Sequence, residues 1–167
     1  MFFLRGIFLG LVLLVGIDIS STFASHFWSG HIHWESEETL TVRFTFVATF
    51  TRSAYSGSGP DGYPVTGDSF LESAGETRLC FGETKEGCTE ILYFKVTAYD
   101  PVADWVIGVA GASVGEEGIQ HAYQSTGEYT VASKSCCRIS TISTPNAHLN
   151  NPDGHFRVST KVALPIP

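Results

Sequence analysis

The sequence lacks the short motifs that point to familiar catalytic chemistry. Neither Gly-x-Ser-x-Gly nor His-Glu-x-x-His occurs in its 167 residues, so the serine-hydrolase elbow and the zinc-protease helix are not indicated. The pairs Glu37–Glu38 and Glu116–Glu117 stand in expected turns, whereas a glycosidase needs two carboxylates across a cleft. We therefore predict a protein that is not an enzyme and keep an extracellular hydrolase with an unrecognised site as an alternative.

Positive charge is scarce. Ten Lys and Arg residues face 17 Asp and Glu residues, which gives a net charge of −7. Scattered basic residues in an acidic chain argue against nucleic acid or an anionic membrane surface as the partner. The composition instead suits a soluble protein that meets an extracellular protein or a glycan.

Long hydrophobic runs are also few, and the clearest one lies at the start. Gly6 to Ile17 is apolar, Arg5 precedes it, and Thr22-Phe23-Ala24 offers a cleavage site after Ala24. This run suits a signal peptide over residues 1–24 and is short for a membrane span; an uncleaved anchor is the alternative. We predict a secreted or cell-surface protein with one domain over 25–164, no membrane span after cleavage, and a linker or tail over 165–167.

Helix-period patterns are nearly absent, and strand patterns replace them. From Leu40 to Phe50, every second residue is apolar, while Thr and Arg fill most of the positions between. Such alternation indicates an antiparallel sheet with one buried face, which a second layer must cover. We predict an all-β fold, an antiparallel β-sandwich of about seven to eight strands. The expected strands include 27–34, 40–51, 76–81, 90–99, 103–110, 128–133 and 154–164.

Four cysteines follow the predicted cleavage site: Cys80, Cys88, Cys136 and Cys137. Disulfides are the default in an exported protein. Cys80 and Cys88 can close a hairpin around FGETKEG. Bridges from the neighbours at 136 and 137 back to these two residues are the alternative. The spacing matches no structural zinc pattern.

One metal site is a candidate on the first strand. His31, His33 and Glu35 follow one another at every second position, so their side chains share one face and could bind zinc or copper. We expect Trp28, Ile32 and Trp34 on the opposite, buried face. Calcium is a further possibility, because Asp100, Asp104, Glu116, Glu117, Asn150, Asn151 and Asp153 stand in expected loops or near strand ends. No resident cofactor is otherwise indicated.

A long loop over 52–68 is the other candidate site. It holds four glycines and two prolines and no regular period, and loops of this length are often mobile or functional. Tyr55 and Tyr63 are expected to be exposed contact residues in it. With the tryptophans they suggest an alternative function, a calcium- or carbohydrate-binding lectin-like module.

Two segments resemble known families. The segment HAYQSTGEYTV (121–131) resembles the last hairpin of polycystic-kidney-disease (PKD) domains. SHFWSGHIHW (25–34), with TRSAY and SCCRIS further along, resembles the N-terminal domain of large secreted or surface multidomain proteins with Ig-like or PKD-like repeats. The resemblance implies an Ig-like sandwich with an extracellular binding, adhesion or scaffolding role, and it implies no catalytic residue.

Overall fold

A computed structural model of the chain describes residues 27–72, 77–83, 87–89, 92–135 and 156–165. The predicted signal peptide and the predicted calcium ligands beyond residue 135 lie outside these ranges, as do Cys136 and Cys137. The described elements are β1 (Phe27–Ser36), β2 (Thr41–Thr51), η1 (Arg52–Ala54), β3 (Ser69–Leu71), β4 (Arg78–Cys80), β5 (Tyr93–Asp100), β6 (Trp105–Gly111), β7 (Ile119–Ala122), β8 (Glu128–Ser135) and β9 (Phe156–Ala163).

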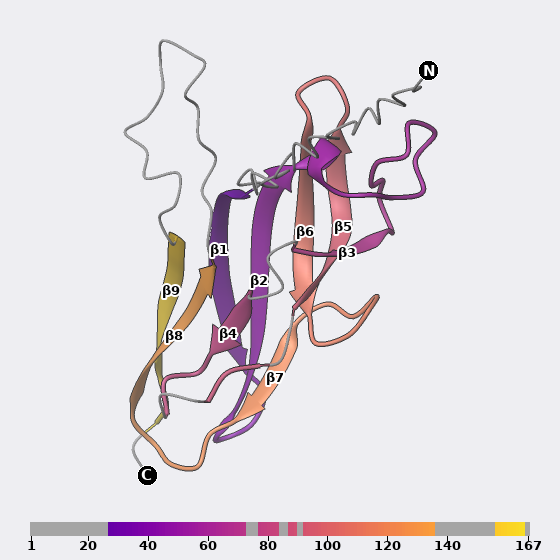
Figure 1. The fold of residues 1–167 in the computed structure, drawn as a ribbon. Coiled ribbons are helices and arrows are strands. Elements are labelled where there is room, and N and C mark those ends of the chain that lie inside the picture. Colours follow the sequence, from indigo (N-terminus) through magenta and orange to yellow (C-terminus); the bar gives the residue numbers. More distant parts are fainter. Residues whose placement is uncertain (1–26, 73–76, 84–86, 90–91, 136–155, 166–167) are drawn as a thin grey trace, which may run out of the picture.

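The strands form two antiparallel sheets in a sandwich-like arrangement (Figure 1). The six-stranded sheet has the order β1-β2-β6-β5-β3, and β7 pairs with β2 beyond the end of β6. The three-stranded sheet has the order β4-β8-β9. The predicted all-β sandwich is therefore confirmed. The described residues hold nine strands instead of seven to eight, because β3 and β7 are too short to show a period in the sequence.

Strand β2 forms the centre of the core. Its burial alternates strictly, and the inward set Val42, Phe44, Phe46, Ala48 and Phe50 is at most 1% exposed. These residues join one hydrophobic cluster with Leu79 of β4, Val131 of β8 and Val162 of β9. The alternation read from the sequence thus points inward as predicted, and the second sheet covers it.

Strand β1 differs from the sequence-based expectation at its start. Phe27 is buried and packs edge-on against Phe50, whereas Trp28 is 45% exposed. The pairing register with β2 shifts between Phe27 and Ser29. An extra residue at a bulge reverses the side on which the preceding residues point. The predicted inward face of β1 is therefore correct for Ile32 and wrong for Trp28.

The edges of the two sheets meet at β1 and β9. The indole N–H of Trp34 donates a hydrogen bond to the backbone carbonyl of Lys161, with 2.9 Å between nitrogen and oxygen. Trp34 is half-buried and packs against the core cluster. This bond joins the edge strands of the two sheets directly.

We expect Phe50→Ala to lower the free energy of unfolding by about 3–5 kcal/mol. The Phe50 ring contacts the rings of Phe27, Tyr55, Phe70 and Phe94, and the surrounding side chains cannot fill the cavity left behind. Urea denaturation measures the change. Val102→Ala is the matched control, because Val102 is 95% exposed, and a loss as large in the control would contradict the assignment of Phe50 to the core.

Candidate binding face on the six-stranded sheet

The outer face of the six-stranded sheet carries an unusual mixture of side chains. The register places Ser29, Thr49 and Ile107 in one row across β1, β2 and β6, and His31, Val47 and Val109 in the next. Each of these side chains is half-buried or exposed. Threonine and serine hydroxyls thus alternate with branched apolar side chains on a pleated surface.

A third row carries two tryptophans. Thr51 of β2 pairs with Trp105 of β6, and the indole N–H of Trp28 donates to Thr51 Oγ1 at 2.9 Å. This bond holds the Trp28 ring on the outer face. Trp105 is half-buried and lies on β6, across β2 from Trp28. The nine residues of the three rows are called the outer band below: Trp28, Ser29, His31, Val47, Thr49, Thr51, Trp105, Ile107 and Val109.

Formal charge is absent from the outer band itself. Residues 27–34, 44–51 and 105–111 contain no Asp, Glu, Lys or Arg, although the chain has ten basic and 17 acidic residues. Charged residues flank the band: Lys95 and Asp100 of β5 pair with Val109 and Trp105, and Arg43 contacts Glu37, to which Gln120 also donates. The hydrogen bonds from Arg43 and Gln120 lower the pKa of Glu37, and the bond from Arg43 has the larger effect.

The predicted metal ligands lie on this outer face, with His31 in the band and His33 and Glu35 following it along β1. His31 pairs with Val47, His33 with Thr45 and Glu35 with Arg43, so all three point outward as expected. The structure brings His33 Nε2 and Glu35 Oε1 to 3.4 Å. Within the described ranges, no three His, Cys, Asp or Glu side chains are grouped as metal ligands would be. The site at His31, His33 and Glu35 stays a prediction.

Two of the described oxygen ligands considered for calcium, Asp100 and Asp104, accept hydrogen bonds from neighbouring loop residues. Asp100 accepts hydrogen bonds from the backbone N–H groups of Val102 and Ala103, and these lower its pKa. Asp104 accepts from the backbone and side chain of Ser53. Both carboxylates thus stabilise loops at the end of the sheet by accepting hydrogen bonds, which is the ordinary role of aspartate in turns.

A cavity of about 420 Å³ opens where β6 leads to β7. It is lined by Arg43, Ala112, Glu116, Glu117, Gly118, Ile119 and Gln120. Glu117 is bound to Lys95 at 2.7 Å. Because Arg43 binds Glu37 and both acidic and basic groups line the walls, the cavity has no single charge with which to select a ligand.

The loop over 52–68 is held by a buried arginine. Arg52 is 2% exposed, and its guanidinium binds both carboxylate oxygens of Asp61 and the carbonyl of Pro64. It also lies over the rings of Tyr63 and Tyr99. The Arg52 hydrogen bonds are the main reason why the pKa of Asp61 falls to about 2. Bidentate pairs of this kind fix geometry strongly, so this loop is a folded part of the domain.

The two loop tyrosines differ in exposure. Tyr63 is 39% exposed, but Tyr55 is 6% exposed and packs against Phe50 and Phe70. Burial is the main reason why the pKa of Tyr55 rises. The expectation of an exposed Tyr55 is wrong, because the loop folds back over the inner face of the sheet and needs an apolar side chain there.

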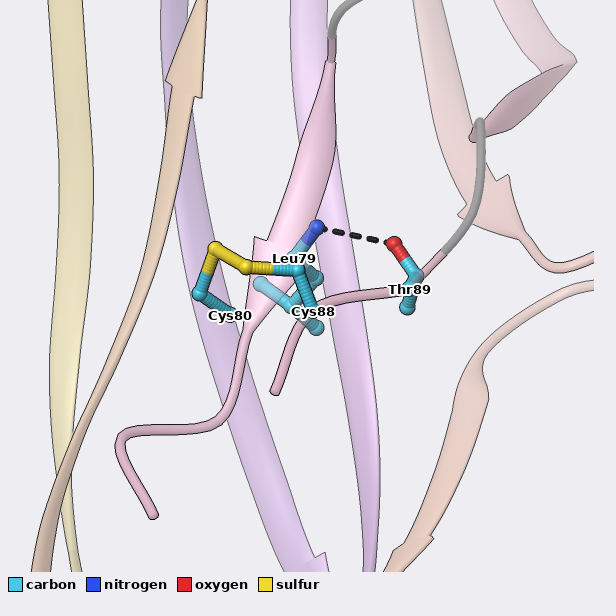
Figure 2. Close-up of a disulfide and its surroundings, with 4 residues drawn as sticks. All are labelled: Leu79, Cys80, Cys88 and Thr89. Atoms are coloured by element: carbon cyan, nitrogen blue, oxygen red, sulfur yellow. Dashed lines mark hydrogen bonds between the residues drawn. A yellow bond between two sulfur atoms is a disulfide. The ribbon is translucent and has the colours of Figure 1, made fainter. Parts of the chain in front are cut away.

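The disulfide joins Cys80 and Cys88 (Figure 2). These residues face each other across an antiparallel bridge, and the Thr89 hydroxyl accepts a hydrogen bond from the Leu79 N–H beside them (Figure 2). The hairpin pairing considered from the sequence is therefore the one found. The alternative bridges from residues 136 and 137 to these cysteines are not.

The disulfide loop also contacts β7 of the six-stranded sheet. Glu83 Oε2 lies 2.9 Å from His121 Nε2, and the Glu83 carboxylate accepts a hydrogen bond from the backbone N–H of Gln124. The hydrogen bond from the Gln124 N–H is the main reason why the pKa of Glu83 is lowered. The His121 ring stacks on Phe81. The pair Glu83 and His121 was not predicted from the sequence, because 38 positions separate the two residues.

A disulfide within an antiparallel all-β domain indicates the class of extracellular β-sandwich modules. The chain belongs to the family described as integrin beta-like protein A-E, N-terminal domain, whose family model matches residues 28–165. The predicted likeness to the N-terminal domain of surface proteins is confirmed at this level, and the PKD-like relationship stays a prediction.

None of the curated proteins and none of the solved structures matches the chain. Together, the family and the disulfide suggest an extracellular protein. In the described part of the chain, no helix is long and apolar enough to cross a membrane. The predicted signal peptide and domain bounds stay predictions.

We expect Asp61→Asn to destabilise the domain near neutral pH and to have little effect near pH 2. The pKa of Asp61 is about 2 in the fold against an ordinary value of 3.8, so the ion pair with Arg52 stabilises the fold above about pH 4 and loses this contribution as the pH falls. Urea denaturation of parent and variant between pH 2 and 7 measures the difference. A difference that is constant over this range would contradict the ionic role of Asp61.

We expect the double variant Cys80→Ala/Cys88→Ala to lose about 2–3 kcal/mol of unfolding free energy, because the bridge closes a short loop with a sequence separation of 8. Guanidinium denaturation measures the loss. The single variant Cys88→Ala should lose at least as much, since it removes the same bridge and leaves a thiol. A double variant as stable as the parent would show that this bridge does not constrain the fold.

Proposed function

We propose that this domain is a non-catalytic binding module of an extracellular adhesion or scaffolding protein, and that its contact surface is the outer band. The observation that carries the proposal is the exposure of an uncharged, partly aromatic band on the outer sheet face of a chain with a net charge of −7. Binding surfaces are depleted in charge at their centres and enriched in aromatic residues. Exposed patches of this kind mark interaction sites.

The sandwich architecture supports this assignment. The band lies on the regular strands β1, β2 and β6, and the neighbouring loops are held by Arg52 and by the disulfide. Sites on strands keep their geometry better than sites on loops. The family match places the domain among N-terminal domains of integrin beta-like proteins. An extracellular binding role fits that family description, and it needs no catalytic group.

The test measures attachment of the whole secreted chain, displayed as a multimer, to cells of the organism that carries the gene. We expect Val47→Glu to abolish attachment, because Val47 lies in the middle of the outer band between His31 and Val109. Thr49→Arg is a second variant. It places a bulky positive charge on the band at a half-buried, outward-facing position, so the core is not altered. Flow cytometry gives the readout.

Val102→Glu is the matched control, since it introduces the same charge at an exposed valine in the β5–β6 turn. The proposal requires that both band variants lose attachment while keeping the melting temperature of the parent. Equal loss in the control, or full attachment of both band variants, would refute the outer band as the contact surface.

A further inference from the structure

Resting on the proposed binding role, we propose that the row Trp28–Thr51–Trp105 is a stacking platform for a neutral glycan chain. The two indoles come from β1 and β6, on either side of β2. Neighbouring strands lie about 4.8 Å apart, so the two strands are separated by roughly 10 Å across the sheet. That separation is longer than one pyranose ring, and the platform therefore accommodates more than one sugar unit.

The Trp28 ring is fixed in advance of binding. Its N–H donates to Thr51 Oγ1, so the ring gives up little rotational freedom when a ligand stacks on it. The bulge between Phe27 and Ser29 turns the Trp28 side chain outward, where it is 45% exposed. A preorganised aromatic ring is an efficient anchor, because less entropy is lost on binding.

The surroundings of the two rings match a neutral sugar in chemistry. A pyranose presents a C–H face that stacks on an aromatic ring and a rim of hydroxyl groups that need hydrogen-bond partners. The next row supplies the hydroxyls of Ser29 and Thr49, and the apolar side chain of Ile107 lies beside them. Hydroxyls both donate and accept, which suits sugar hydroxyls in either role.

The absence of formal charge from the band selects against anionic glycans as preferred ligands. Residues 27–34, 44–51 and 105–111 hold no Lys or Arg with which to pair a sulfate or carboxylate. Lys95, which pairs with Val109 at the edge of the band, is already bound to Glu117. The chain as a whole is acidic, which repels such ligands further. A protein partner could bind the same surface, and the experiment below distinguishes a protein partner from a glycan ligand.

The experiment compares the whole secreted chain with its variants on an array of immobilised neutral oligosaccharides, with sulfated and sialylated oligosaccharides alongside. We expect binding to a subset of the neutral glycans and none to the charged ones. Trp28→Ala should weaken binding by about tenfold or more, because the stacked ring and its buried area are lost. Trp28→Phe should lose less.

Thr51→Val isolates the orienting hydrogen bond. It removes the Oγ1 acceptor of the Trp28 N–H and keeps a branched side chain, so it should weaken binding by a factor smaller than Trp28→Ala. Val114→Glu should bind as the parent does, since Val114 is 67% exposed and lies between β6 and β7, beyond the end of β6 opposite to Trp105. Equal binding by Trp28→Ala and the parent would overturn the platform.

Periodate treatment of the cells used in the attachment assay separates this proposal from the proposed function. Loss of attachment after oxidation of the cell-surface sugars supports a glycan ligand. Attachment that survives periodate, together with no binding on the array, overturns the glycan proposal in favour of a protein partner and leaves the binding role intact. Failure of the untreated cells to bind the parent chain removes both proposals.

Discussion

The strict alternation of β2 is the constraint on which the rest of the structure depends. The strand pairs with β1 along one side and with β6 and β7 along the other. A slip of one residue would turn Phe44, Phe46 and Phe50 to solvent and bury threonines in their place. The large apolar area of the phenylalanines fixes the register, and through it the register of three neighbouring strands.

The two sheets differ in size, and the difference explains the long loop. Three strands cannot cover the inner face of a six-stranded sheet, so the segment after β2 folds back and adds Tyr55 to the rings of Phe50 and Phe70. Arg52 then fixes that segment by binding Asp61 and Pro64. The arginine is buried with its charge paired, as a buried charge must be.

The same alternation that builds the core decides the character of the opposite face. Each inward residue of β2 is followed by a residue that points outward. In the C-terminal half of the strand the outward residues are Val47, Thr49 and Thr51 rather than charged residues. Strand β6 does the same with Trp105, Ile107 and Val109. The outer band is therefore mildly apolar and free of formal charge, which is the physical basis for assigning it a contact role.

The sequence by itself determined the fold class, the inward face of β2 and the absence of familiar catalytic motifs, because alternation and motif spacing are local properties of the chain. It narrowed the disulfide to a few pairings, and only the antiparallel bridge between Cys80 and Cys88 decided among them. Tertiary structure alone decided that Trp28 faces outward and Tyr55 inward. A bulge and a loop that folds back depend on contacts with distant residues, such as Phe50 and Phe70, and no local period encodes them.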